Sequence, residues 1–155
     1  MIRAITPADV GTVLQLIRDL AAYERDPDAV KATHETLHEA LFGATPAAEA
    51  VLAEIDGEAV GVALFFFNFS TWSGKRGLYL EDLFVREAAR GTGTGTALLR
   101  HLARIAIERD CARFEWAVLD WNAPAIGFYK SIGAVAMTDW TIMRVEGDAL
   151  AKLAA

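Results

Sequence analysis

The fold of this chain is decided by residues 79–96, which begin with the run Tyr79-Leu80-Glu81-Asp82-Leu83-Phe84-Val85 and end with Arg90-Gly91-Thr92-Gly93-Thr94-Gly95-Thr96. The first run is rich in residues that favour a pleated, half-buried surface, which predicts a strand. After Gly95, apolar residues recur every three to four positions and charged residues share the opposite face. This pattern predicts an amphipathic helix to about Arg109. A strand therefore leads into a glycine-rich turn, and the turn opens a helix.

The alternate glycines of this turn remove side chains where an anion can approach the backbone. The N–H groups of a helix's first turn have no partner inside the helix, and the macrodipole adds partial positive charge, so the turn suits a phosphate. The pattern is not the G-x-G-x-x-G dinucleotide fingerprint, because Thr96 stands where the third glycine is needed, and no Gly-Lys-Ser/Thr follows to make a P-loop. A tight turn without a ligand is the alternative, and glycine spacing does not choose between the two.

The pattern Arg90-x-x-Gly93-x-Gly95 after an apolar strand resembles the coenzyme A signature of the GNAT N-acetyltransferases, Gln/Arg-x-x-Gly-x-Gly/Ala. From about Ile2 to Leu153 the chain resembles the diamine (spermidine/spermine) N-acetyltransferases and their thialysine-acetylating relatives. The motifs that carry this likeness, in the same order, are Tyr79-Leu80-Glu81-Asp82, Arg90-Gly91, Trp121-Asn122-Ala123-Pro124 and Phe128-Tyr129-Lys130. The resemblance implies direct acetyl transfer from acetyl-CoA to a primary amine of a small cationic acceptor, either a polyamine or a thialysine-like amino acid. It also implies a homodimer.

Composition sets limits on the class of protein. A chain of 155 residues, 54% hydrophobic and 23% charged, has the size and composition of one folded domain, which we expect over residues 1–155. No apolar run reaches the roughly 18 residues of a membrane span, and the N-terminus lacks the shape of a signal peptide, so we expect a cytoplasmic protein without a membrane partner. The net charge of −6 argues against nucleic acid as a partner and helps to attract a cation.

Residues that could bind a metal or form a disulfide are few. Cys111 is the single cysteine, which excludes an internal disulfide and a thiolate cluster. His34 and His38 are four residues apart on a predicted helix, but no third ligand accompanies them. We therefore expect no metal.

The remaining periodicities predict the other elements. Thr6-Pro7-Ala8-Asp9 and Thr33 are helix-start signals, and Asp56-Gly57 is a hairpin turn. We expect helices over residues 7–23, 33–41, 96–109 and 122–129, and strands over residues 1–6, 49–54, 59–69, 79–85, 113–120, 133–138 and 140–145. This order predicts a single α/β (α+β) domain whose mixed, mostly antiparallel sheet of six to seven strands carries helices on both faces.

Glu81 and Asp82 are adjacent carboxylates in an otherwise apolar strand. An alkylammonium has a pKa of about 10.4, so losing its proton at pH 7 costs about three powers of ten, and a group that accepts this proton matters. One of the two acids could bind the amine and take its proton; the alternatives are a salt-bridged structural acid or an acid that protects a strand edge. Alternation puts the two on opposite faces unless a bulge intervenes.

The resemblance assigns roles to these and to other residues. It favours Glu81 as the proton acceptor and places a bulge near Phe84, where a backbone N–H faces the thioester carbonyl. It makes Tyr129 the general acid for the leaving sulfur, whereas the residue alone suggests a half-buried ring with a wet hydroxyl. It implies that the cofactor is held by Leu83, Phe84, Val85, Arg90, Gly91, Thr92, Gly93, Thr94, Gly95, Thr96, Asn122, Pro124, Ala125, Tyr129 and Lys130. Asn122 has the alternative role of a helix cap.

The substrate-binding residues that the resemblance implies are Tyr23, Glu24, Trp72, Glu81, Asp82, Glu115 and Trp116. Tyr23 and Glu24 could equally be a helix-terminal ring and a solvated acid. Two departures weaken the assignment of the acceptor: Ser131-Ile132 replace a pair of arginines, and Glu115-Trp116-Ala117 differ from the family's polyamine contacts. Acetylation of a peptide or antibiotic amine, or an idle acetyl-CoA-binding module, are therefore the alternative functions.

Overall fold

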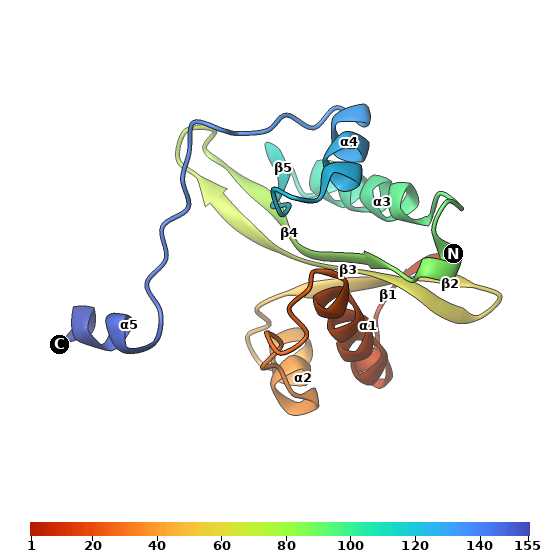
Figure 1. Ribbon diagram of the computed structural model, residues 1–155, viewed down its shortest axis with the longest axis horizontal. Coiled ribbons are helices and arrows are strands. Elements are labelled where there is room, and N and C mark those ends of the chain that lie inside the picture. The colour runs from red at the N-terminus through yellow and green to blue at the C-terminus, as the bar shows by residue number, and fades with distance from the viewer. The chain divides into compact units, whose positions relative to one another are not determined.

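The computed structural model describes residues 1–155, and these divide into two compact units, Met1–Ala117 and Val118–Ala155. The first unit holds β1 (Ile2–Ala4), η1 (Pro7–Asp9), α1 (Val10–Tyr23), α2 (His34–Phe42), β2 (Glu49–Ile55), β3 (Glu58–Ser70), β4 (Lys75–Val85), η2 (Glu87–Ala89), α3 (Thr94–Glu108) and β5 (Arg113–Trp116) (Figure 1). The second holds α4 (Ala123–Ser131) and α5 (Gly147–Ala154). The single domain predicted over residues 1–155 stays a prediction, because each unit makes its own compact set of contacts.

One mixed sheet organises the first unit, with its strands in the order β1-β2-β3-β4-β5. The strands from β1 to β4 pair antiparallel, and β4 pairs parallel with β5. Helices α1 and α2 cover one face of this sheet, which we call the α1 face, and α3 covers the other, the α3 face (Figure 1). The predicted mixed, mostly antiparallel sheet with helices on both faces is confirmed.

The predicted number of six to seven strands is wrong, because the sheet has five. Residues 133–138 and 140–145 form no strand, and β5 ends at Trp116 instead of Asp120. A strand needs a neighbouring ladder for its backbone hydrogen bonds, so apolar alternation alone does not make one. Segment 132–146 has no such ladder. The tail, for which no element was predicted, forms α5.

The helix starts follow their sequence signals. The Asp9 carboxylate accepts hydrogen bonds from the Thr6 N–H at 2.7 Å and from the Thr6 hydroxyl at 2.9 Å. At α2 the Thr33 hydroxyl accepts from the Thr36 N–H at 3.2 Å, while the Thr33 N–H donates to the Thr36 hydroxyl at 2.8 Å. These capping bonds satisfy N–H groups that the helices leave unpaired, and they fix where α1 and α2 meet the sheet.

Apolar side chains fill both faces of the sheet. On the α1 face the buried cluster consists of Val10, Val13, Leu14, Leu16, Leu20, Leu37, Leu41, Ala50, Leu52, Val62, Leu64 and Phe84. On the α3 face α3 buries Leu98, Leu99, Leu102 and Ala106. Gly61 allows this close approach, since a Cβ there would lie 3.2 Å from the Leu98 Cδ1 atom and 3.1 Å from the Phe84 carbonyl oxygen.

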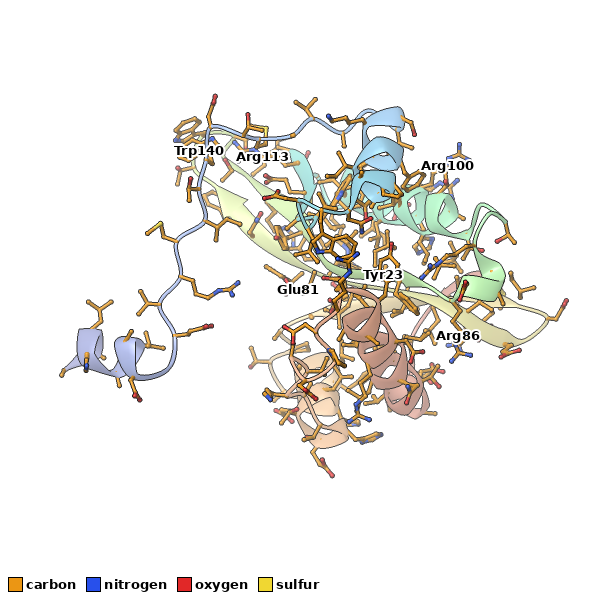
Figure 2. The ribbon with its side chains drawn as sticks, in the orientation of Figure 1. Tyr23, Glu81, Arg86, Arg100, Arg113 and Trp140 are labelled. Carbon is orange, nitrogen blue, oxygen red and sulfur yellow. The ribbon has the colours of Figure 1, made fainter.

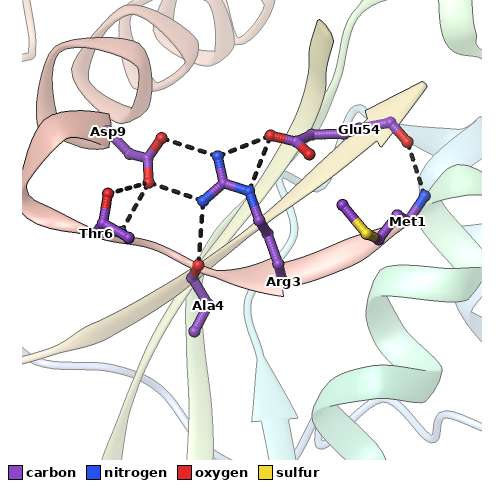
Figure 3. A network of polar contacts seen from close by, with 6 residues as sticks. All are labelled: Met1, Arg3, Ala4, Thr6, Asp9 and Glu54. Carbon is purple, nitrogen blue, oxygen red and sulfur yellow. Dashed lines mark hydrogen bonds and ion pairs between the residues drawn. The ribbon is translucent and has the colours of Figure 1, made fainter. Parts of the chain in front are cut away.

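An ion-pair network fastens the N-terminal strand to its surroundings (Figure 3). The Arg3 guanidinium donates two hydrogen bonds to the Asp9 carboxylate, at 2.8 and 2.9 Å, and lies 2.7 Å from the Glu54 carboxylate. The Met1 ammonium donates to the Glu54 carbonyl at 2.7 Å. Hydrogen bonding to Arg3 holds the pKa of Asp9 well below its usual range. These acids are therefore structural, because each is matched by a cation.

Candidate active site

The two parallel strands of the sheet separate where the predicted site begins. β5 pairs with β4 only from Gly77 to Leu80, whereas β4 continues to Val85 beside β3 alone. From Glu81 to Val85 the outer edge of β4 therefore has no neighbouring strand. An open edge presents backbone N–H and C=O groups that a ligand can use. We call this stretch the open edge of β4.

A β-bulge lies at the start of the open edge. Leu80 pairs with Phe65 and Asp82 with Leu64, so Glu81 is the extra residue of β4. The bulge expected near Phe84 is therefore misplaced, because Phe84 pairs in register with Val62. The insertion has a physical reason: without it one of the two adjacent carboxylates would point into the core of the α3 face.

The bulge brings Asp82 onto the α1 face. Directly paired residues of antiparallel strands share a face, and the partner of Asp82, Leu64, belongs to the buried cluster of that face. Asp82 is half-buried there, while Glu81 is exposed. The end of α1 reaches the same place, where Figure 2 labels Tyr23 and Glu81.

Three carboxylates gather at this point. Burial raises the pKa of Asp82 to about 6, and the nearby charges of Glu81 and Glu24 add to this effect. Burial also raises the pKa of Glu24, which follows the last residue of α1. None of the three carboxylates forms an ion pair with a side chain of the chain. Neither Glu81 nor Asp82 is therefore a salt-bridged structural acid. The alternative that one of them protects a strand edge is consistent with their place at the open edge.

An aromatic surface continues the α1 face beyond the end of α1. The rings of Phe66 and Tyr79 lie 5.2 Å apart between centroids. The pKa of Tyr79 is raised by burial and, in addition, by the charges of Glu81 and Glu115. Glu115 pairs with Tyr79 across β4 and β5, so a fourth carboxylate borders this surface. Rings beside carboxylates are suited to an alkylammonium.

The sequence predicts no site role for Phe66 or Tyr79, and core packing is the role it predicts for the Phe66 ring. Phe66 lay hidden in the apolar run Leu64–Phe67, and Tyr79 was read only as part of a motif. The available signal was the spacing of Tyr79 and Glu81, which period-two alternation places on one side of a strand. The bulge at Glu81 ends this regular alternation.

Two predicted substrate residues are not brought to this surface. Trp116 pairs with Leu80 and stacks edge-on against Phe114 at 5.0 Å, so it lies on the face opposite Glu115. Trp72 lies in the turn between β3 and β4 and is 82% exposed. Trp72 precedes Lys75, the first residue of β4, and Lys75 and Glu81 are six positions apart along the strand, which corresponds to about 20 Å.

The glycine turn joins β4 to α3 as predicted. Gly91 and Gly93 have φ of 78° and 84°, which other residues rarely adopt, and nothing lies within 4 Å of a Cβ built on either. α3 begins at Thr94, two residues before the predicted start, and no side chain caps its first turn. The turn therefore exposes backbone N–H groups at the positive end of a helix of 15 residues.

Arg90 points away from this turn. Its Nε donates to the Val85 carbonyl at 3.1 Å, and its guanidinium lies 4.7 Å from the centre of the Tyr23 ring and 5.7 Å from that of Phe84. The Arg90 side chain thus links the end of α1 to the end of β4, although Arg90 and Tyr23 are far apart in the sequence.

The second unit carries the remaining predicted residues. Asn122 is buried and caps α4, its Oδ1 accepting from the Ala125 N–H at 3.4 Å, so its alternative role as a cap is confirmed. Pro124 lies in the first turn of α4. Tyr129 lies one turn further, with its ring 5.6 Å from that of Phe128, and Lys130 follows near the end of the helix.

Comparison with known proteins identifies the class. A family model, the acetyltransferase (GNAT) family, matches residues 14–134. The bovine (Bos taurus) thialysine N-epsilon-acetyltransferase is 41% identical to the chain, over 99% of the chain and 96% of the bovine protein. The human (Homo sapiens) spermidine/spermine N(1)-acetyltransferase-like protein 1 is 33% identical, over 99% of the chain and 23% of the human protein.

Solved structures agree on the fold. An integron cassette protein from the mobile metagenome of V.cholerae superposes with a TM-score of 0.83 at 30% identity, covering 99% of this chain and 96% of that one. The chain belongs to the acetyltransferase (GNAT) family. Within that family it is an N-acetyltransferase, an enzyme that acylates an amine. None of its helices is long and apolar enough to cross a membrane.

Proposed function

We propose that the protein transfers an acetyl group from acetyl-CoA directly to a primary amine of a small cationic acceptor, a polyamine or diamine or a thialysine-like amino acid. The observation that carries this proposal is the set of carboxylates beside the open edge of β4 that no side-chain cation neutralises. An alkylammonium would supply the missing positive charge, and the open edge lies next to it. The names of the bovine and human relatives support an acceptor of this kind.

The residues of the first unit fit the proposed cofactor. GNAT acetyltransferases use acetyl-CoA as the acyl donor, and when bound it supplies the thioester acetyl group. The backbone of the open edge, Leu83, Phe84 and Val85, would hold the pantetheine arm as a neighbouring strand would. The open glycine turn from Arg90 to Thr96 and the uncapped start of α3 would hold the pyrophosphate. The proposed contacts from the second unit are Asn122, Pro124, Ala125, Tyr129 and Lys130.

In the proposed mechanism the residues of this chain divide three tasks. Glu24, Glu81 and Asp82 attract the ammonium and one carboxylate of β4 takes its proton, which leaves the nitrogen lone pair free. A backbone N–H of the open edge donates to the acetyl oxygen as that oxygen gains charge. Tyr129 gives its hydroxyl proton to the departing sulfur. Support for Tyr129 is the match to Phe128-Tyr129-Lys130 and its place on the second turn of α4.

A panel of amines with acetyl-CoA tests the proposal. We expect acetylation of diamines, polyamines or thialysine at rates well above those for aminoglycosides and peptide α-amines. Preference for a peptide or an antibiotic would replace the proposed acceptor while keeping the reaction. Tight binding of acetyl-CoA with no transfer to any amine would favour the idle binding module instead.

We also propose that the protein is a homodimer. In support, large apolar side chains of segment 132–146 are exposed, namely Val135, Met137, Trp140, Ile142, Met143 and Val145. Exposed apolar groups of this density mark interaction surfaces in proteins. Equilibrium sedimentation at micromolar concentration should give twice the mass of 16.8 kDa, and a single-chain mass would contradict the dimer.

A further inference from the structure

We infer that Arg113 and Glu115 of β5 bind the charged head group of an α-amino acid acceptor, with its carboxylate at Arg113 and its α-ammonium at Glu115. This inference rests on the proposed function and deepens it, because it selects the thialysine-like amino acid over the polyamine. The observation behind it is that two oppositely charged side chains share one face of the sheet and neither has an ion partner.

Glu115 ends a row of side chains that crosses three strands on the α1 face. It pairs with Tyr79 across β4 and β5, and Tyr79 pairs with Phe66 across β3 and β4. Phe66 is two positions along β3 from Leu64, which belongs to the buried cluster of that face. The first row therefore consists of two rings and, at its β5 end, a carboxylate.

Arg113 ends the next row of the same face, and Figure 2 labels it at the start of β5. It pairs with Gly77, which pairs with Asn68 on β3. A Cβ built on Gly77 would lie 3.7 Å from the Arg113 Cβ and 2.5 Å from the Asn68 Oδ1 atom, so these positions face the same side. A guanidinium and an amide thus stand in one row, and both carry N–H donors that suit a carboxylate.

The two charges are accessible and lack ion partners. Arg113 is exposed and Glu115 is half-buried, and they form no ion pair with each other or with another side chain. Glu115 also lies close enough to Tyr79 for its charge to help raise the pKa of that phenol. Arg113 and Glu115 are two positions apart on a strand, about 7 Å between Cα atoms. Side chains of this length can reach the two adjacent groups of one zwitterion.

The spacing along the sheet suits the length of such an acceptor. Glu115 is one strand across and two residues along from Glu81, about 8 Å between Cα atoms by strand geometry. The carboxylates beside the open edge would hold the side-chain ammonium, and the rings of Phe66 and Tyr79 would lie along the aliphatic part. The head group then reaches Glu115 and Arg113. A polyamine lying in the same direction would bring a further positive charge to Arg113, and like charges repel.

Three acceptors of one backbone test the inference. They are thialysine, its decarboxylated analogue, which is a diamine, and its deaminated analogue, which keeps the carboxylate and the side-chain amine. With saturating acetyl-CoA, kcat/KM of the wild type for thialysine should exceed that for either analogue by about 10-fold or more, since each analogue lacks one charged contact.

Two variants assign the two contacts separately. Arg113→Gln should raise KM about 10-fold for thialysine and for the deaminated analogue, while the diamine changes less than about twofold. Glu115→Gln should raise KM about 10-fold for thialysine and for the diamine, while the deaminated analogue is not impaired. In both variants kcat should be nearly unchanged, because the head group lies away from the reacting nitrogen and binds equally in the ground and transition states.

Matched controls come from the exposed side of α3, where Arg104→Gln and Glu108→Gln remove the same two charges from the other face of the sheet. Neither should change the order of the three acceptors, and circular dichroism should show all four variants folded. A wild type that acetylates no amine overturns the proposed function itself. An active wild type that prefers the diamine to thialysine, or whose preference survives both β5 variants, overturns this inference alone.

Discussion

Replacing Asp82 by Asn should make the protein more stable at pH 7. The folded protein raises the pKa of Asp82 from an ordinary 3.8 to about 6. Because the folded state then binds the proton more tightly than the unfolded state, ionising Asp82 opposes folding. Two pH units at 1.36 kcal/mol each correspond to about 3 kcal/mol, and an Asn in the same half-buried place loses part of this gain. We expect a net stabilisation of about 1–3 kcal/mol.

Urea denaturation at a series of pH values measures this effect. Wild-type stability should fall as the pH rises from about 4 to about 6, the window between the unfolded and folded pKa values of Asp82. In Asp82→Asn most of this slope should vanish, leaving the part due to Glu24, whose pKa is also raised by burial. Asp28→Asn, in an exposed turn, should retain the full slope. Loss of stability in Asp82→Asn at pH 7 would refute the idea that the folded protein disfavours the ionised form of Asp82.

Four further predictions concern other parts of the molecule. A double-mutant cycle of Arg90→Met and Tyr23→Leu in urea should give a coupling energy of about 0.5–1 kcal/mol for the cation–π contact, and strict additivity would contradict that contact. Tyr129→Phe should lower turnover by about 10²-fold or more with acetyl-CoA affinity nearly kept; an unchanged rate would remove Tyr129 from the mechanism. Phe65→Ala, at a side chain 1% exposed, should cost about 3–5 kcal/mol in urea denaturation, and a cost below 1 kcal/mol would contradict its place in the core. The lowered pKa of Asp9 should stabilise wild type above about pH 4, with the benefit lost as the pH falls further; Asp9→Asn should lack this acid-sensitive part in thermal melts.

Local sequence signals predicted the parts of the fold that local chemistry determines. The caps at Thr6 and Thr33, the hairpin turn at Asp56 and Gly57, and the glycine turn all carry residues whose own bonds or φ angles set the backbone. They were placed within a few residues of where they occur. The prediction of strands over residues 133–138 and 140–145 was wrong because a strand depends on a neighbouring strand that can be distant in the sequence, and a local pattern does not report that neighbour.

The candidate site shows the same division. Sequence and resemblance together point to the adjacent carboxylates and to the Tyr23-Glu24 pair. In the structure Glu24, Glu81 and Asp82 lie close enough for their charges to interact. The position of the bulge was not found, because it depends on how β3 and β4 align over their whole length. A one-residue difference in that alignment decides which carboxylate is exposed and which is half-buried.

The unpaired carboxylates beside the open edge of β4 support our proposal that a cationic acceptor binds there. Some acids of the first unit have cation partners: Arg3 binds both Asp9 and Glu54, and Arg109 donates to both oxygens of Glu49. Near the site a guanidinium is available, yet Arg90 lies over the ring of Tyr23 and pairs with no carboxylate. Like charges held together without a partner reduce stability, and such strain is retained where function needs it. An ammonium group bound there would relieve that repulsion, and this gain would favour a cationic acceptor over a neutral one.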